Sequence, residues 1–403
     1  MTMTSPTIDL TMLADPALRA DPYPLLRQMR EASPLPLIDG LLVVTGRHRD
    51  CSAVLRHPHA SSERYRSALT APNLEISTLS FLSLDPPDHT RLRRLVSSAF
   101  TPRVVTALRP RITEIVDSLF RRVAEQGRMD VIDDLAYPLP VQIISELLGV
   151  PAEDHERLRA WSAQLARGLD PQFTDPDPER VAVAEGARTE FNRYFSTLIA
   201  QRRTHPREDL LSLLVHAESE GDKLNEEELL ATCVLLLVAG HETTTNLIAN
   251  AVLALLRHPD QLDALRARPD LVDGCTEETL RYDPPVQMTT RAARGTLPVG
   301  EVEVPDGGIA VLLIAAANRD PDVFDEPDRF DITRKPGGHL AFAAGIHFCL
   351  GAGLARLESA VALDAFAQRI VAPRLLEPVE YKANINLRGP ARLDVTFDAI
   401  RSL

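Results

Sequence analysis

The feature that most constrains this chain is a long helical segment near its middle. Residues 226–256 keep helical periodicity for about thirty positions and contain no proline. At 1.5 Å per residue such a helix is roughly 45 Å long. It must therefore cross a whole domain instead of covering one face of it.

The remaining pattern predicts a mainly α protein with a smaller β-rich portion drawn from both ends of the chain. Residues 35–45 alternate around Asp39-Gly40, which is typical of a hairpin. The stretch 318–345 is rich in Pro, Asp and Gly and should be irregular. Further helices are expected at residues 21–32, 103–126, 140–148, 179–203 and 350–370. Strands are expected at residues 299–304 and 309–314, on either side of a Pro-Asp-Gly-Gly turn.

Charge and hydropathy exclude two classes of protein. The net charge of −13 argues against a protein that neutralises phosphates, so no nucleic-acid partner is expected. The most apolar run, residues 229–240, is far shorter than the about 20 residues of a membrane span. The first ten residues resemble no export signal. We expect a cytoplasmic monomer without a membrane anchor.

One of the four cysteines stands in an unusual context. Cys349 follows Phe342-Ala-Ala-Gly345-Ile-His347-Phe and precedes Leu-Gly351, just before an expected helix. A helix N-terminus favours a thiolate. The glycines allow a tight backbone whose N–H groups point at the sulfur, and Phe342 can keep water away. The alternative is a chance thiol in a glycine-rich loop. A shielded thiolate suits haem iron.

The spacing Phe-x-x-Gly-x-His-x-Cys-x-Gly resembles the haem-binding loop of the cytochrome P450 superfamily, in its soluble bacterial form. One departure is Ala343, where many relatives carry glycine, and it adds only a methyl group. The resemblance covers nearly all of residues 15–395 and implies one domain, residues 1–403. It also implies haem b between the long central helix and the cysteine loop, with Cys349 as axial ligand.

The middle of the long helix carries Ala239-Gly240-His-Glu242-Thr243. Thr243 can donate to the carbonyl of Ala239, the small residues leave room for O₂, and Glu242 with Thr243 can pass protons. Alternatively, the threonine bonds back without further role and Glu242 faces solvent. The segment is similar to the oxygen-binding part of the superfamily's central helix. That similarity implies that Thr243 stabilises bound dioxygen and that Glu242 gates proton delivery.

A Glu-x-x-Arg pattern follows at Glu278 and Arg281. On most helices such a pair lies on the surface and contributes a few tenths of a kcal/mol. The resemblance implies instead that the pair is buried and binds an arginine of the irregular stretch. Arg334 is our first choice for that arginine and Arg329 the second.

Haem propionates need cations or hydrogen-bond donors, and arginine binds carboxylates through two parallel hydrogen bonds. The resemblance implies four residues at these groups: His89, Arg93, Arg291 and His347. Taken singly, each could equally be a solvated surface residue. Their order and spacing together favour the propionate role.

These features predict a haem-thiolate monooxygenase that inserts one atom of O₂ into a lipophilic small molecule by hydroxylation or epoxidation. The sequence has no P-loop, no GxGxxG and no appended flavin or iron–sulfur segment. Electrons should therefore come from a separate ferredoxin and its NAD(P)H-dependent reductase. Two alternatives stay open: a peroxide-driven or isomerising relative, and a non-catalytic haem carrier or sensor.

The substrate pocket is predicted from position in the family alone. Its mostly apolar residues suggest a fatty acid, terpenoid, steroid or macrolide-like compound. The expected lining comprises residues 168–177, Phe81, Leu82, Leu235, Leu236, Met288, Thr289, Ile385 and Asn386.

An acidic ferredoxin needs a basic patch on an acidic protein. Arg91 and Arg94, beside Arg93, are expected to supply that patch, with Arg103 and Arg109 nearby. Alternatively, these arginines balance neighbouring carboxylates.

Overall fold

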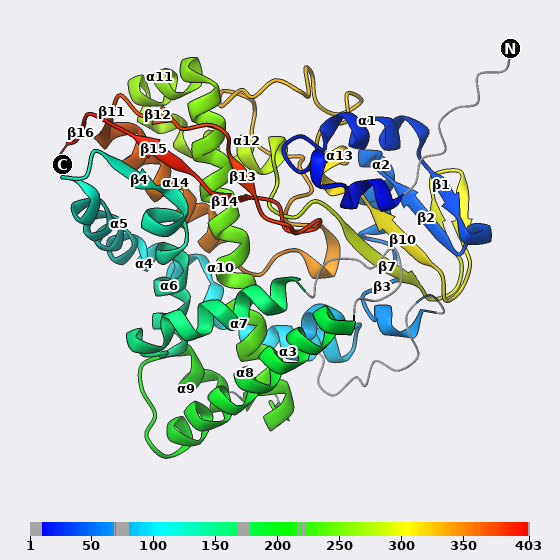
Figure 1. Ribbon diagram of the computed structural model, residues 1–403. Helices are drawn as coiled ribbons and strands as arrows, with labels where there is room; N and C mark the ends of the chain where they lie inside the picture. Colours follow the sequence, from blue (N-terminus) through cyan, green and yellow to red (C-terminus); the bar gives the residue numbers. More distant parts are fainter. Residues whose placement is uncertain are drawn as a thin grey trace, which may run out of the picture.

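A computed structural model describes residues 10–67, 69, 80–167, 178–216, 218–219 and 222–401. The long helix α10 (Glu226–Arg257) has 32 residues and runs through the middle of the molecule (Figure 1). It starts at a capping box, in which Asn225 and Glu228 satisfy each other's backbone N–H groups. It ends just before Pro259, which has no N–H to continue the ladder.

Helices pack around α10 on most sides. The largest apolar cluster joins α10 to α5 and α14 and includes Phe120, Ile248, Val252 and Phe366. None of the described helices is long and apolar enough to cross a membrane. The other helices are α1 Tyr23–Ala32, α2 His48–Val54, α3 Asp88–Ser97, α4 Pro102–Ala107, α5 Arg109–Val123, α6 Pro138–Leu148, α7 His155–Arg167, α8 Pro178–Thr204, α9 Leu210–Val215, α11 Pro259–Ala267, α12 Val272–Tyr282, α13 Ile314–Ala317 and α14 Ala352–Arg369.

The β portion consists of a main sheet, which lies to one side of α10 (Figure 1), and several small sheets of two or three strands. Its main sheet has five strands in the order β1-β2-β10-β7-β3, with β10 parallel to β2 and antiparallel to β7. The strands are β1 Leu35–Leu37, β2 Leu42–Thr45, β3 Ala60–Ser61, β4 Arg128–Asp130, β5 Glu218–Ser219, β6 Asp222–Lys223, β7 Thr289–Ala293, β8 Leu297–Val299, β9 Val302–Val304, β10 Ile309–Leu312, β11 Ile370–Val371, β12 Arg374–Leu375, β13 Glu380–Tyr381, β14 Pro390–Arg392, β15 Asp394–Thr396 and β16 Ala399–Ile400.

The C-terminal segment returns to the middle of the fold. Strand β15 pairs with β4, and the turn between β13 and β14 lies on α10. Arg388 of this turn donates to the carbonyls of Arg19 and Ala20 near the other end of the chain. Residues from both ends thus meet beside the central helix.

The sequence-based prediction of a mainly α chain with a smaller β portion is confirmed. So are the hairpin at residues 35–45 and the irregular stretch from residue 318 to residue 344. Two boundaries were wrong. The helix expected at 103–126 breaks into α4 and α5, because Pro110 in the first turn of α5 lacks an N–H donor.

The second error concerns the strand expected at residues 299–304. Gly300 has a φ of +60°, and the chain reverses there, so that β8 pairs with β9. Strand β9 consequently does not pair with β10, which lies between β2 and β7 instead.

Candidate active site

The cysteine loop is a tight, irregular segment that ends at the start of α14. The N–H of Cys349 donates to the carbonyl of Phe342 at 2.9 Å, which closes the loop on itself. Gly345 has a φ of +70°, and a Cβ there would lie 2.5 Å from the carbonyl oxygen of Leu55. This position therefore needs glycine for both its conformation and its space. Ala343 also has a positive φ, +57°, although it carries a side chain.

Cys349 is the one accessible cysteine of the four in the chain, since Cys51, Cys233 and Cys275 are fully buried. Burial raises the pKa of the Cys349 thiol, while the N–H groups of Gly351 and Ala352 lower it. The backbone donors at the start of α14 are thus aimed at the sulfur, as the sequence predicted.

The middle of α10 has one open strip. Within residues 236–255, Ala239 is exposed and Gly240 and Thr243 are half-buried, whereas all the others are buried. The Thr243 hydroxyl donates to the Ala239 carbonyl at 3.0 Å, as expected. Gly240 was expected to leave room for O₂, but its Cα faces the neighbouring helix α6. A Cβ at this residue would lie 3.0 Å from Ile144 of α6, so its lack of a side chain serves helix packing.

Glu242 is buried, so the alternative of a solvent-facing carboxylate is wrong. Its Oε2 lies 3.4 Å from Lys382 Nζ, and its Oε1 lies 3.6 Å from His241 Nε2. Burial raises the pKa of Glu242, but the contacts with His241 and Lys382 outweigh it and hold the value at about 2. The carboxylate is therefore charged at neutral pH and bound by a lysine 140 residues away.

Four side chains gather beside the cysteine loop without carboxylate partners. The rings of His89 and His347 are 4.3 Å apart, and Arg93 donates to the carbonyl of Phe348 at 2.5 Å. Both ring nitrogens of His89, and Nε2 of His347, are buried without a hydrogen-bond partner in the described chain. Arg291 of β7 is also buried. Its Nη1 donates to Thr289 Oγ1 and to the Thr290 carbonyl, and no described carboxylate lies within ion-pair distance of it.

Burial and mutual repulsion act on these groups. Burial, with Arg64 as a further cause, lowers the pKa of Arg291 to about 10. Burial also lowers the pKa of His347 to about 3, helped by the charge of Arg291. A cluster of cationic and orphaned donor groups in the protein interior is costly unless an anion satisfies it.

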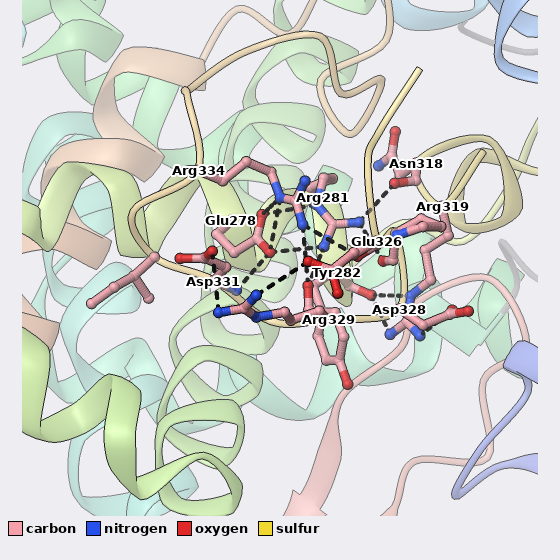
Figure 2. A network of polar contacts seen from close by, with 12 residues as sticks. Glu278, Arg281, Tyr282, Asn318, Arg319, Glu326, Asp328, Arg329, Asp331 and Arg334 are labelled. Carbon is pink, nitrogen blue, oxygen red and sulfur yellow. Dashed lines mark hydrogen bonds and ion pairs between the residues drawn. The ribbon is translucent and has the colours of Figure 1, made fainter. Parts of the chain in front are cut away.

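A second polar cluster fixes the irregular stretch before the cysteine loop (Figure 2). Glu278 and Arg281 of α12 form two hydrogen bonds of 2.8 Å, and both side chains are buried. Arg334 forms an ion pair with Glu278 at 3.2 Å, as our first choice required. Arg329 instead extends its side chain to Glu326, and only its carbonyl accepts a hydrogen bond from Arg281.

Comparisons with known proteins agree with this geometry. The family model described as Cytochrome P450 matches residues 41–370 of the chain. The chain belongs to the cytochrome P450 family. It is 44% identical to the cytochrome P450 monooxygenase PikC of Streptomyces venezuelae over 91% of this chain and 88% of that one. It is 41% identical to the vitamin D(3) 25-hydroxylase of Pseudonocardia autotrophica over 94% of each chain.

A solved structure of a relative shows the same fold. The ligand-free crystal structure of Mycobacterium smegmatis CYP164A2 superimposes with a TM-score of 0.92, at 48% identity. The match covers 96% of this chain and 99% of that one. As a member of the family, the chain is a cytochrome P450 monooxygenase, and the family's cofactor is haem.

The residues of this cytochrome P450 fit a haem. Buried His89, His347 and Arg291 have donors that no described carboxylate satisfies, which is what two propionates require. Cys349 offers an accessible sulfur, and Phe342 packs in the same loop with its side chain buried. The open strip of α10 supplies a surface of small residues.

The residues expected to line the substrate pocket of this cytochrome P450 fall into two groups. Met288 and Ile385 line one cavity together with apolar residues near the start of the described chain. Phe81 and Leu236 are buried in a different apolar cluster, where Leu235 also packs. Leu82 is exposed and Thr289 half-buried. The loop at residues 168–177 lies outside the described residues.

A hollow of about 540 Å³ opens beside the cysteine loop of this cytochrome P450. Cys349, Arg93, Arg109 and Arg356 line it, and exposed Phe348 forms part of its wall. Arg91 does not belong to this group, contrary to our expectation. It lies against Glu228 at the start of α10, so its charge is already balanced.

Sequence reasoning missed four polar residues of this site: Lys382, Glu277, His339 and Arg356. Lys382 contacts Glu242, and Arg356 with His339 binds Glu277 on α12. No signal in the sequence points to Lys382, because it is remote along the chain and its turn has no motif. Arg356 lies in the first turns of the helix after Cys349, and that position alone could have drawn attention to it.

Proposed function

We propose that this chain is a haem-thiolate monooxygenase that inserts one atom of O₂ into a lipophilic small molecule by hydroxylation or epoxidation, with Cys349 as the axial ligand of haem b. The observation that carries the proposal is the accessible Cys349 sulfur, which faces backbone N–H groups at the start of α14. The other three cysteines are buried in apolar clusters.

The other residues of the site position the Cys349 sulfur or bind the haem. Phe342, Gly345 and Gly351 shape the loop, exclude water and leave the N–H donors pointing at the sulfur. His89, Arg93, Arg291 and His347 bind the propionates, because their donors are otherwise unsatisfied or face no carboxylate. Glu278, Arg281 and Arg334 hold the preceding stretch in place.

When bound, a haem held by a thiolate supplies the electron density that favours O–O cleavage. Thr243 holds its hydroxyl on the open strip of α10, where it donates to the Ala239 carbonyl and would have to turn from it to donate to dioxygen. Glu242, after it is released from Lys382, takes up a proton from water and passes it on to that hydroxyl. Ala239 leaves the space that dioxygen needs, and Gly240 keeps α10 close to α6.

Electrons come from a ferredoxin and its NAD(P)H-dependent reductase. The hollow beside Cys349 supports this choice, since exposed Arg109 on its wall offers an acidic partner a complementary charge. We further propose that the protein works as one domain, because residues from both ends of the described chain meet beside α10. A cytoplasmic monomer is part of the same proposal.

The substrate is a lipophilic small molecule, and the turn at residues 382–389 shapes part of its pocket through Ile385. Met288 and Ile385 line a common small cavity, to which Leu13, Leu18 and Leu26 also contribute. The vitamin D(3) 25-hydroxylase, named for a lipophilic substrate, is similar over nearly its full length. A fatty acid, terpenoid, steroid or macrolide-like compound fits this class.

Two other functions remain as alternatives: a peroxide-driven relative and a haem carrier or sensor. The buried Glu242 beside Thr243 favours the oxygenase, because neither alternative needs a proton relay. Coupled consumption of O₂ and NAD(P)H with a ferredoxin system separates the three. A carrier consumes neither, and a peroxygenase turns over with peroxide alone.

The ligand assignment is tested by Cys349→Ser. The wild type should show the strongly red-shifted Soret band of a ferrous–CO thiolate complex, and the variant should lose both that band and turnover. Cys275→Ser, a change at a buried cysteine of α12, is the matched control and should keep the band. Persistence of the band in Cys349→Ser would assign the ligand to another residue.

A further inference from the structure

Helix α12 also carries Glu277, whose carboxylate points away from the neighbouring Glu278–Arg281 pair. Glu277 Oε1 lies 2.6 Å from Nε of Arg356, and its Oε2 lies 3.1 Å from Nη2 of the same guanidinium. His339 Nε2 lies 3.2 Å from that Oε2. Glu277 therefore binds α14 and the start of the cysteine loop, whereas Glu278 binds the irregular stretch before the loop.

The geometry is that of a well-formed charged pair. Two parallel N–H···O bonds join a guanidinium and a carboxylate, which is the strongest arrangement available to these groups. Glu277 is only 15% exposed on its side chain, and Arg356 is 39% exposed. Burial raises the pKa of Glu277, but His339 and Arg356 outweigh it and hold the value at about 2. The acid is thus charged throughout the physiological range.

The guanidinium is also placed against the cysteine loop. It lies over the ring of Phe342, 4.6 Å from the centroid, and the Phe342 carbonyl accepts the hydrogen bond from Cys349. Arg356 lines the same hollow as Cys349.

These contacts indicate that Glu277 and Arg356 affect electron transfer, in addition to holding the cysteine loop in place. A cation near the thiolate draws electron density from the sulfur and stabilises the reduced state of a metal bound to it. The Glu277 carboxylate opposes that cation and fixes its position. The net field at the sulfur then depends on both members of the pair, with opposite sign.

We propose that Glu277 and Arg356 are positioning residues that set the reduction potential of the bound haem, by holding one compensated positive charge against the Cys349 thiolate. The inference rests on the proposed function, in which Cys349 is the axial ligand. Glu277 and Arg356 touch neither substrate nor the reacting atoms, and they act through the sulfur.

The test is a spectroelectrochemical titration of the haem-loaded protein, with the ferrous–CO spectrum recorded for each variant. Arg356→Gln removes the cation and should lower the reduction potential. Glu277→Gln leaves the cation uncompensated and should raise it. Each shift should be on the order of tenfold in the one-electron reduction equilibrium, or about 59 mV.

Three further variants separate charge from shape. Arg356→Lys keeps the positive charge and should stay close to the wild-type potential. The double variant Glu277→Gln with Arg356→Gln should have a reduction potential between those of the two single variants. Asp263→Asn removes an exposed carboxylate that pairs with Arg266 on α11, and it is the control for a general loss of negative charge.

Shifts of opposite sign in the two neutral variants support the proposal, because a structural defect has no reason to change sign with the charge removed. Potentials that shift in the same direction in both neutral variants, or that do not shift, would show that the pair only holds the loop in place. Loss of the red-shifted band in a neutral variant, without opposite shifts, would show the same. If the wild type itself lacks the red-shifted band, the proposed function fails first. The two failures are therefore distinguishable.

Discussion

Glu278 and Arg281 lie three residues apart on α12 and 2.8 Å apart at their charged ends, and each side chain is only 2% exposed. Breaking a buried pair leaves an uncompensated charge in the interior. We expect Arg281→Met to lower the free energy of unfolding by about 3–5 kcal/mol, measured by chemical denaturation. Arg329→Gln removes an arginine that is 57% exposed and should change the same quantity by less than about 0.5 kcal/mol. Equal changes in the free energy of unfolding for the two variants would contradict a stabilising role of the buried Glu278–Arg281 pair.

Ala343 has a φ of +57°, in the left-handed region that favours glycine. In the sequence this departure from the family pattern adds only a methyl group, whereas the backbone conformation makes it a strained position. A non-glycine residue in this conformation costs roughly 1–2 kcal/mol. Ala343→Gly should therefore stabilise the protein by about 1 kcal/mol in thermal or chemical unfolding. Ala344→Gly, next to it in extended backbone, should not stabilise.

The Thr243 hydroxyl lies on the open strip of α10, and its neighbour Thr244 is buried. We expect Thr243→Ala to retain haem and substrate binding but to divert electrons into peroxide, which lowers the ratio of product formed to NAD(P)H consumed. Thr244→Ala removes a hydroxyl that also bonds to the preceding turn, at 3.3 Å, and should leave the ratio unchanged. A normal ratio in Thr243→Ala would remove Thr243 from the relay.

Lys382 helps to hold the pKa of Glu242 at about 2, well below its ordinary value of 4.5. A depressed carboxyl pKa contributes stability above the unfolded value, and this contribution is lost as the pH falls through the folded one. Lys382→Met should therefore lower the free energy of unfolding at neutral pH, and the difference from wild type should shrink as the pH falls from about 4.5 toward 2. Lys335→Met, at an exposed lysine, is the control. A difference independent of pH would show that packing, not charge, is lost.

Arg109 lines the basic hollow beside Cys349. Arg109→Glu should weaken ferredoxin-driven turnover severalfold and flatten its dependence on salt, because a surface charge acts through screened attraction. Peroxide-supported turnover should be unchanged. Arg128→Glu reverses an exposed arginine that does not line the hollow and should leave both assays intact. Equal loss in the two assays would indicate damage to the fold.

The sequence pattern was sufficient to predict the structure wherever a single stretch of chain determines its own conformation. The absence of proline predicted the extent of α10, and the glycine spacing predicted the loop around Cys349. The Glu-x-x-Arg motif led to the buried pair, and the arginine expected with it, Arg334, does contact Glu278. In each case the relevant contacts lie within one helix or loop, or follow from the family pattern.

Tertiary packing decided the rest. Gly240 packs on Ile144, which a sequence pattern along one helix cannot show. Arg91 meets Glu228 across 137 residues, and Lys382 meets Glu242 across 140. The pairing of β10 between β2 and β7 likewise joins segments far apart in the chain. These partners are set by how elements dock, and no spacing rule connects them.

The turn at residues 382–389 is fastened at several points. Lys382 N–H donates to the Gly389 carbonyl, the Asn386 carbonyl accepts from Gln287, and Gly389 packs so closely on Asn246 that a Cβ would lie 2.5 Å from its Oδ1. An inserted or deleted residue would break this register and pull Lys382 away from α10. Libraries that aim to redirect substrate choice should therefore keep the length of this turn constant and vary only which side chain stands at Ile385.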